Sequence, residues 1–237
     1  MAKTKNTARV ATEVDKERLY EPAEALGMVR RLAFAKFDES IDVVFTLGID
    51  ARKADQLVRG TVSLPHGTGK TVRIAVFADG EQAKEAEEAG ADIVGGQDLA
   101  DQIAAGGSLN FDLAIATPSM MPVVGKLGPV LGPRGLMPNP KSGTVTQDVG
   151  KAVSEFKAGK VEYRNDRYGN VHLPVGRVSF EPSHLLENLG TASAEIIRAR
   201  PASAKGRFLN KISVSSTMGP GIRIDPNTVE ELVKELY

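Results

Sequence analysis

The sequence predicts a two-part fold, in which an α+β domain built from both ends of the chain carries an α/β domain inserted between its halves. Strand patterns at 41–47 and 60–64 follow one amphipathic helix near the start. From Val72 the pattern changes to short apolar runs that alternate with helical segments, which is typical of βαβ units. Strand patterns of the first kind resume at 160–176. An insertion is the simplest chain path that explains this order.

Charge varies along the chain in a similar way. The chain has 30 basic and 30 acidic residues, yet the net charge is −3 over 68–157 and +6 over 157–223. Glycine-rich segments near 65–70 and 157–160 are candidate linkers with hinge freedom. We therefore expect one domain from residues 1–67 and 159–237, with 68–158 inserted. The basic bias of the outer part indicates either a phosphate-binding surface or an ordinary solvated face.

The first outer segment predicts one helix and two strands. Pro22 suits a first helical turn, and Leu26, Val29 and Leu32 recur at near-helical spacing, so a helix is expected over 22–34. The β-branched and aromatic run IDVVFTL and the weaker run GTVSL predict the strands at 41–47 and 60–64.

The middle segment predicts a small parallel sheet covered by helices, a Rossmann-like, three-layer α/β domain. The expected strands are VRIAVFA at 72–78, DIVGG at 92–96 and LAIAT at 113–117, with helical patterns at 81–91 and 99–107 between them. A last helix places Val149, Val153 and Phe156 on one side and ends at Gly159, a residue type favoured after a helix C-terminus.

The second outer segment predicts strands and helices in alternation. KVEYRN at 160–165 and NVHLPVG at 170–176 are expected to pair as a hairpin across DRYG. A helix begins at Pro182, and LNKISVSST at 209–217 alternates polar and apolar residues as a half-buried strand does. The last helix is expected to open at Asp225 and Pro226.

Composition argues against an enzyme, a metal site and a membrane protein. Cysteine is absent, which fits a reducing compartment and removes thiolate ligands and nucleophiles. His66, His172 and His184 have no metal-ligand spacing, and no Gly-x-Ser-x-Gly elbow is present. No apolar run approaches the roughly 20 residues of a bilayer span, and the Lys-rich start lacks a signal-peptide core. We expect a cytoplasmic, non-catalytic protein without cofactor, metal or small-molecule substrate.

The run GTGKT at 67–71 resembles a phosphate-binding loop but has the wrong spacing. The nucleotide motif needs glycine five residues before its Gly-Lys pair, where this chain has Leu64, and the dinucleotide motif needs glycine where it has Val72. A turn at a domain linker explains these glycines better. A nucleotide-dependent enzyme built on the α/β block stays open as a rival interpretation, as does a purely structural interaction protein.

The densest feature is a glycine- and proline-rich segment at 120–144. We expect it to exclude a regular helix and to form a structured loop that docks on the core through its interleaved apolar residues. Lys126, Arg134 and Lys141 would then be cations displayed from the loop.

Part of this segment, GKLGPVLGPRGLMPNPKSGTV at 125–145, closely resembles the signature of the universal large-subunit ribosomal protein one family. The resemblance extends over essentially the whole chain through AKFDESIDV at 35–43, DQLVRGTVSLPHGTGK at 55–70, AGKVEYRNDRYGNVHLPVG at 158–176 and STMGPGIRID at 216–225. It implies a ribosomal stalk protein whose terminal pieces form the RNA-binding domain.

The resemblance also implies partners and contact residues. The partners would be large-subunit ribosomal RNA at the stalk, deacylated tRNA leaving the exit site, and the protein's own mRNA, whose translation it would repress; outside the ribosome it would be a monomer. The expected RNA-binding residues are Lys36, Phe37, Glu39, Arg164, Asp166, Arg167, His172, Ser215, Thr217, Met218 and Gly219. Lys126, Arg134 and Lys141 would make secondary RNA contacts.

The chemistry of these side chains suits recognition of a folded RNA. Ser215 and Thr217 offer hydroxyls to 2′-OH groups, and Gly219 allows the RNA backbone to approach closely. Phe37 either presents an apolar face to a ribose or base or fills the protein core. Glu39 orients an arginine, accepts from a 2′-OH, or is a solvated carboxylate. His172 is either a strand surface residue or a phosphate or sugar contact.

Overall fold

The structure is a computed structural model that describes residues 9, 10, 12–107 and 109–236. Most of the charged leader lies outside these residues. Contacts within the chain divide it into two compact units. Met1–Gly69 and Val161–Tyr237 form the terminal unit, and Lys70–Lys160 forms the middle unit. Among the described helices, none combines the length and the apolar character needed to cross a membrane.

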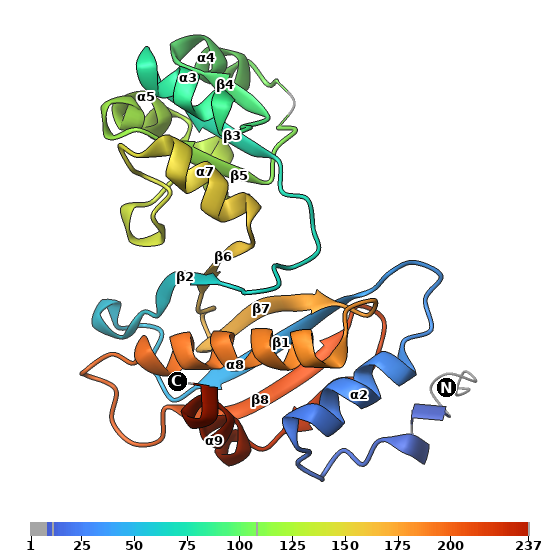
Figure 1. The fold of residues 1–237 in the computed structure, drawn as a ribbon. Helices are drawn as coiled ribbons and strands as arrows, with labels where there is room; N and C mark the ends of the chain where they lie inside the picture. Colours follow the sequence, from blue (N-terminus) through green and yellow to red (C-terminus); the bar gives the residue numbers. More distant parts are fainter. Residues whose placement is uncertain (1–8, 11, 108, 237) are drawn as a thin grey trace. The chain divides into compact units, whose positions relative to one another are not determined.

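The terminal unit is built on a four-stranded antiparallel sheet (Figure 1). Its strand order is β7-β1-β8-β9, with β1 at Ser40–Leu47, β7 at Asn170–Arg177, β8 at Leu209–Ser216 and β9 at Ile222–Ile224. Every second residue of β1 is buried, because successive strand side chains point to opposite faces. The alternating sequence therefore produces one face for the core and one polar face. Strand β9 was missing from the sequence prediction.

Three helices contact the strands of this sheet: α2 at Pro22–Leu32, α8 at Pro182–Arg198 and α9 at Pro226–Leu236. Proline occupies the first turn of α2 and of α8, as predicted. The core between helices and sheet includes Phe45 and Leu185, both fully buried. Burying such a side chain contributes about 1.5–3 kcal/mol. One face of the sheet is therefore covered by the helices and forms the core, and the other face is left uncovered by them.

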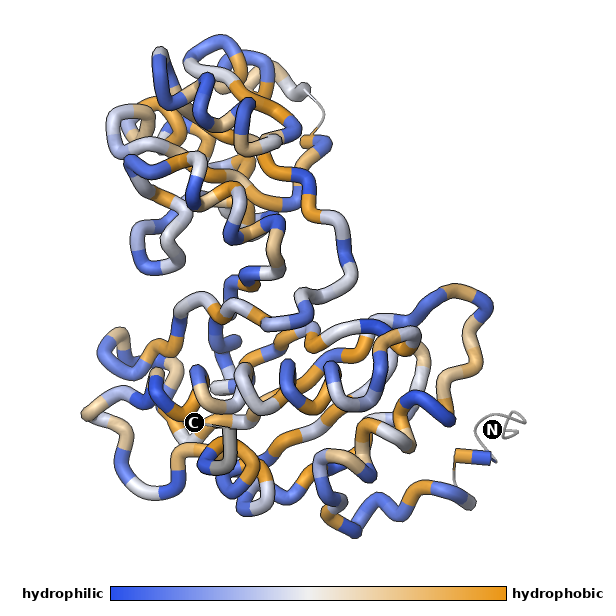
Figure 2. Tube along the Cα trace, viewed as in Figure 1, coloured by the Kyte–Doolittle hydropathy of each residue, from blue (hydrophilic) through white to orange (hydrophobic). Residues whose placement is uncertain are grey.

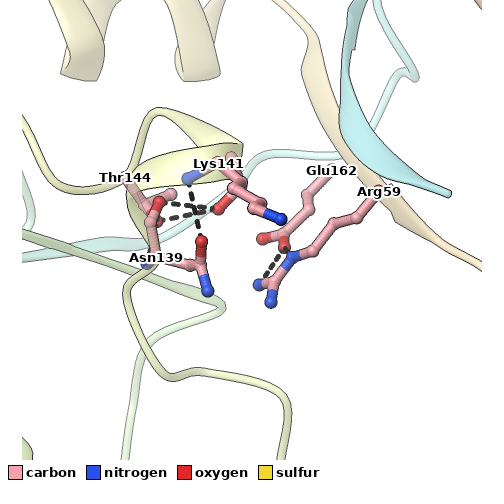
Figure 3. A network of polar contacts seen from close by, with 6 residues as sticks. Arg59, Asn139, Lys141, Thr144 and Glu162 are labelled. Carbon is pink, nitrogen blue, oxygen red and sulfur yellow. Dashed lines mark hydrogen bonds and ion pairs between the residues drawn. The ribbon is translucent and has the colours of Figure 1, made fainter. Parts of the chain in front are cut away.

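The predicted hairpin between 160–165 and 170–176 is wrong. Strand β6, Lys160–Arg164, pairs instead with β2, Arg59–Ser63, in a separate two-stranded sheet. Next to the turn between β6 and β7, pairing takes the form of an isolated bridge between Asn165 and Val171. The Asn165 Oδ1 accepts a hydrogen bond from the Val58 amide at 2.8 Å, and Arg59 pairs with Glu162 at 2.9 Å (Figure 3). These contacts hold β6 against β2.

The middle unit has three layers. Parallel strands in the order β4-β3-β5, at Ile93–Gly95, Ile74–Phe77 and Leu113–Ala116, form its sheet. One apolar cluster joins the sheet to α3, Glu81–Glu88, and α7, Val149–Lys157. Another joins it to α4, Gln97–Ala104, and to the 120–131 segment. Figure 2 shows hydrophobic residues gathered along these central strands. Because both faces are covered, β3 reads as a continuous apolar run rather than an alternating one.

The expectation that 120–144 contains no regular helix is wrong. Short helices form at α5, Met121–Lys126, and at α6, Gly128–Leu131. Proline stands in the first turn of each, where its missing N–H costs nothing. The predicted docking is confirmed for Val124, Leu127 and Leu131, which are buried in the core. It is wrong for Val130, which is 37% exposed.

Candidate nucleic-acid interface

The polar face of the four-stranded sheet carries two of the residues predicted to bind RNA, His172 and Ser215. We call it the open face and define it by the outward-facing positions Asp42, Val44, Thr46, Asn170, His172, Pro174, Lys211, Ser213, Ser215 and Arg223. The register places His172, Val44 and Ser213 side by side across three strands, with Arg223 next to Ser213. Hydroxyls, one imidazole and two cations therefore share a flat surface with a single carboxylate, Asp42.

Asp42 lies in the middle of this face, half-buried between Pro174 and Ser215. Burial raises the pKa of its carboxyl, and the nearby His172 acts in the opposite direction.

One end of the open face is formed by the loop before β1 and the turn after β8. Glu39, only 1% exposed, joins the two. Its carboxylate accepts hydrogen bonds from the amides of Phe34 at 3.1 Å, Ala35 at 2.9 Å and Met218 at 2.9 Å. Burial alone would raise the pKa of Glu39, but the bonds from Met218 and Ala35 hold it below its ordinary value. The interpretation of Glu39 as a solvated carboxylate is therefore wrong, because its side chain is buried and its carboxylate accepts from three backbone amides.

Three apolar side chains are exposed at this end. Phe37 and Met218 are each 56% exposed, and Phe34 is 44% exposed. The interpretation of Phe37 as a core residue is therefore wrong. Lys36, beside it, is also exposed. Phe34 was not identified from the sequence, although its place three residues before Phe37 in the same loop is the signal that would have found it.

Thr217 and Gly219 shape the turn itself. The Thr217 hydroxyl accepts from the Ser40 amide at 3.0 Å and donates to the Ser40 carbonyl oxygen at 3.3 Å. A Cβ added to Gly219 would overlap the buried Ser216 hydroxyl oxygen. A larger residue at 219 would therefore require the Ser216 side chain to move.

The other end of the open face is the turn between β6 and β7. The Asp166 carboxylate accepts from the amides of Tyr168 and Asn170, both at 2.8 Å, and lies 3.7 Å from the His172 Nε2. Burial raises the pKa of the Asp166 carboxyl, but these hydrogen bonds lower it, and the result lies below the ordinary value. The Arg167 guanidinium lies 4.9 Å from the centre of the Tyr168 ring, and that ring is 70% exposed. Sequence reasoning missed Tyr168.

The two ends are separated by most of the length of β1. The partner of Ser40 is Arg177 and that of Thr46 is Asn170, so at about 3.3 Å per residue the ends lie roughly 20 Å apart. Arg164 is exposed in β6, which belongs to the other sheet. The register therefore brings Ser215 and His172 onto one face, places the Thr217 and Asp166 turns at its ends, and leaves Arg164 out.

In the middle unit, Lys126, Arg134 and Lys141 are exposed, and within the described part of the chain none of them forms an ion pair. Lys141 projects from a turn held by buried hydroxyls (Figure 3). The Asn139 side chain accepts from the Lys141 amide, and the Thr144 hydroxyl accepts from the Asn139 amide, both at 2.8 Å. The sequence Asn-Pro-Lys-Ser-Gly-Thr thus builds a rigid turn that displays one cation.

The GTGKT run forms part of a turn fastened to α8. Gly67 and Gly69 have φ values of 63° and 70°, which favour glycine. The Asn188 amide donates to the Gly67 carbonyl oxygen at 3.0 Å. Lys70 pairs with Asp112 at 3.1 Å.

In the portion of the chain described by the structure, no three metal-ligating side chains cluster.

Comparison with known proteins identifies similar sequences. The family profile described as the ribosomal protein L1p/L10e family matches residues 29–220. The chain is 54% identical to the large ribosomal subunit protein uL1 of Thermobifida fusca over 99% of both chains. It is 58% identical to the protein of that name from Cutibacterium acnes, covering 95% of this chain and 97% of the relative. The corresponding protein of Fervidobacterium nodosum is 57% identical over 92% and 93%.

Proposed function

Because this chain belongs to the ribosomal protein L1p/L10e family, a family of structural proteins rather than enzymes, we propose that it binds large-subunit ribosomal RNA through the open face. It would act in the cytoplasm as a constituent of the large ribosomal subunit, as the names of its relatives indicate. The terminal unit would be the RNA-binding domain and the middle unit its insertion.

A single observation carries the assignment to this face. The buried Glu39 carboxylate holds the loop of Phe37 and the turn of Met218 together, so that two apolar side chains stand exposed at the edge of a polar sheet. An exposed apolar pair supported by a buried, hydrogen-bonded acid has no role in the core. Such side chains can stack on bases or riboses, while Lys36 reaches a phosphate.

The rest of the face suits shape-based recognition. Ser213 and Ser215 are small hydroxyl residues on the open face, and 2′-OH groups displayed in the wide, shallow groove of an RNA helix accept and donate to such groups. Arg167 and Tyr168 would grip the RNA at the opposite end, and His172 would contact a phosphate or sugar between them. The Thr217 turn and the Asp166 turn lie roughly 20 Å apart at the two ends of the open face, so one folded RNA could contact both.

We assign the middle unit a secondary role. It carries a net charge of −3 over 68–157, so RNA would be bound weakly by this unit alone. Lys126, Arg134 and Lys141 would supply its contacts, and through them it would assist release of deacylated tRNA from the exit site. The same open face would bind a similar fold in the protein's own mRNA and repress its translation. The free protein would be a monomer.

The test uses the full chain and a transcript of large-subunit ribosomal RNA in filter binding. Phe37→Ala with Met218→Ala should weaken binding tenfold or more, because loss of the Phe37 ring alone removes a stacking contact worth about 1–3 kcal/mol and Met218 adds apolar contact area. Leu57→Ala is the matched control, since Leu57 is 46% exposed in the same unit and outside the face. Equal affinities of the double variant and the wild type would refute the assignment, as would binding by the wild type that does not weaken with salt.

A further inference from the structure

A pocket of about 270 Å³ lies at the edge of the four-stranded sheet, where β8 and β9 meet the start of α9. Its lining includes Arg207, Lys211 and Arg223, together with Leu19, Asp225 and Pro226. The lining therefore includes three basic residues and one acidic residue. This volume is below the roughly 300–1,000 Å³ of most small-molecule sites, so the pocket is too small to enclose a large cofactor.

The cations of this pocket are available to an anion. Across the described residues, Lys211 and Arg223 take part in no ion pair. The Arg207 guanidinium is held in place without a carboxylate, since its Nε donates to the Leu209 carbonyl oxygen and its Nη2 to the Asn227 Oδ1, both at 3.1 Å. Its remaining N–H groups form a preorganised fork of the kind that binds phosphate.

The single carboxylate is engaged locally. Asp225 accepts a hydrogen bond from the Asn227 amide at 2.9 Å, so part of its charge serves the start of α9. On the other side of the pocket Leu19 is 51% exposed. With Pro226 it gives the pocket an apolar wall of the kind that a nucleobase or ribose covers.

The pocket is continuous with the open face. Lys211 is paired with Thr46 and Arg223 with Ser213 in the sheet register, so both cations belong to the face and to the pocket. A strand of RNA bound on the face would bring its phosphates to them. Free phosphate alone would leave the apolar wall without a partner.

We propose that this pocket receives one unstacked nucleotide of the bound RNA, with its phosphate on Arg207, Lys211 and Arg223 and its base or ribose against Leu19 and Pro226. The inference rests on the proposed RNA binding and extends it to residues outside the predicted contacts.

The experiment measures affinity of the full chain for the large-subunit ribosomal RNA transcript across a salt series. Lys211→Ala with Arg223→Ala should weaken binding and lower the slope of log affinity against log salt by about 2, since each phosphate contact contributes about 0.9. Leu19→Ser should weaken binding without changing that slope. Arg198→Ala with Lys234→Ala removes the same charge from α8 and α9 and should leave the slope unchanged; Leu57→Ser is the apolar control.

The outcomes separate the two proposals. If the wild-type chain shows no salt-dependent RNA binding, the proposed function itself fails. Suppose that the wild type binds RNA but the Lys211→Ala, Arg223→Ala variant has the same slope of log affinity against log salt as the wild type. The pocket then holds no phosphate and the inference is overturned. The same follows if the Arg198→Ala, Lys234→Ala control lowers the slope by as much. Unchanged affinity of Leu19→Ser would overturn the apolar half and leave only an electrostatic contact. Thermal unfolding of each variant shows that the fold is retained.

Discussion

The Glu39 carboxylate accepts a hydrogen bond from the Met218 amide at 2.9 Å, although these residues are 179 positions apart in the chain. The same carboxylate accepts from the amides of Phe34 and Ala35. One buried acid thus sets the relative position of two loops that carry exposed apolar side chains. Its role in RNA binding would be one of positioning.

Glu39→Gln should lower both stability and RNA affinity. A glutamine has one acceptor oxygen, and its NH₂ would face a backbone N–H that already donates, so at least one buried donor loses its partner. Hydrogen bonds to charged groups are worth about 1.5–3 kcal/mol, and we expect a loss of about 2–3 kcal/mol in the free energy of unfolding. Urea unfolding measures it, with Glu181→Gln as the control because Glu181 is exposed and makes no capping hydrogen bond. A loss as small as that of the control would contradict the positioning role.

Acid should remove the advantage of the wild type over Glu39→Gln. The folded-state pKa of Glu39 lies below its ordinary value, so its stabilisation is fully present above the unfolded-state pKa and is lost as pH falls through the folded-state pKa. The difference in unfolding free energy should therefore be constant at neutral pH and shrink from about pH 5 downward. If the difference in unfolding free energy between the wild type and Glu39→Gln stays constant down to pH 3, the charge of the Glu39 carboxylate contributes nothing to stability.

Thr217→Val should weaken RNA binding with little loss of fold. The hydroxyl bonds to the Ser40 backbone, so the variant releases the turn from β1 at a cost of about 1 kcal/mol in stability. Thr217→Ser restores the hydroxyl and should restore affinity. If valine and serine variants bind RNA equally well, the turn's attachment to β1 does not matter for binding.

Gly219→Ala should destabilise the turn, and Ser216→Ala should relieve the effect. The added Cβ would overlap the Ser216 hydroxyl oxygen, whereas the Ser216 Cβ lies 3.5 Å away in ordinary contact. Overpacking of this kind costs about 1–3 kcal/mol. Thermal unfolding of both single variants and the double variant forms a double-mutant cycle. Strictly additive effects would rule out the clash.

Tyr168→Ala should weaken RNA binding without affecting stability. The ring is 70% exposed, so it contributes little to the core, while a stacked base would lose about 1–3 kcal/mol with it. Tyr168→Phe keeps the ring and should bind RNA as the wild type does. Affinity that is insensitive to alanine would remove this end of the face from the interface.

Local patterns predicted most of the secondary structure. The alternation in IDVVFTL and in LNKISVSST predicted β1 and β8, and the helices beginning at Pro22, Pro182 and Pro226 were expected from their first-turn prolines and apolar spacing. The error at 120–144 has a local cause too, because proline was treated as a helix breaker where it stands in the first turns of α5 and α6.

Long-range pairing explains what the sequence could not predict. The hairpin failed because Asn165 bonds to Val58, a residue 107 positions earlier. Glu39 was expected in solvent or at RNA because its partner Met218 comes from the other end of the chain. The alternation around Lys211 predicted which side chains of β8 share a face. Arg223 extends the same face, but it lies on the short strand β9, which is recognised only by its pairing with β8.

During synthesis, β1 emerges from the ribosome long before its pairing partner β8. Ile41 of β1 pairs with Ser216 of β8, and at about 5–20 residues per second the ribosome needs roughly 10–35 s to make the chain between them. The middle unit, whose strands are close in sequence, is complete long before that. The nascent chain therefore holds β1 unpaired with β8 while the inserted unit folds. A face made of both strands can therefore form only after most of the chain has been translated, and the proposed RNA binding on it would begin no earlier.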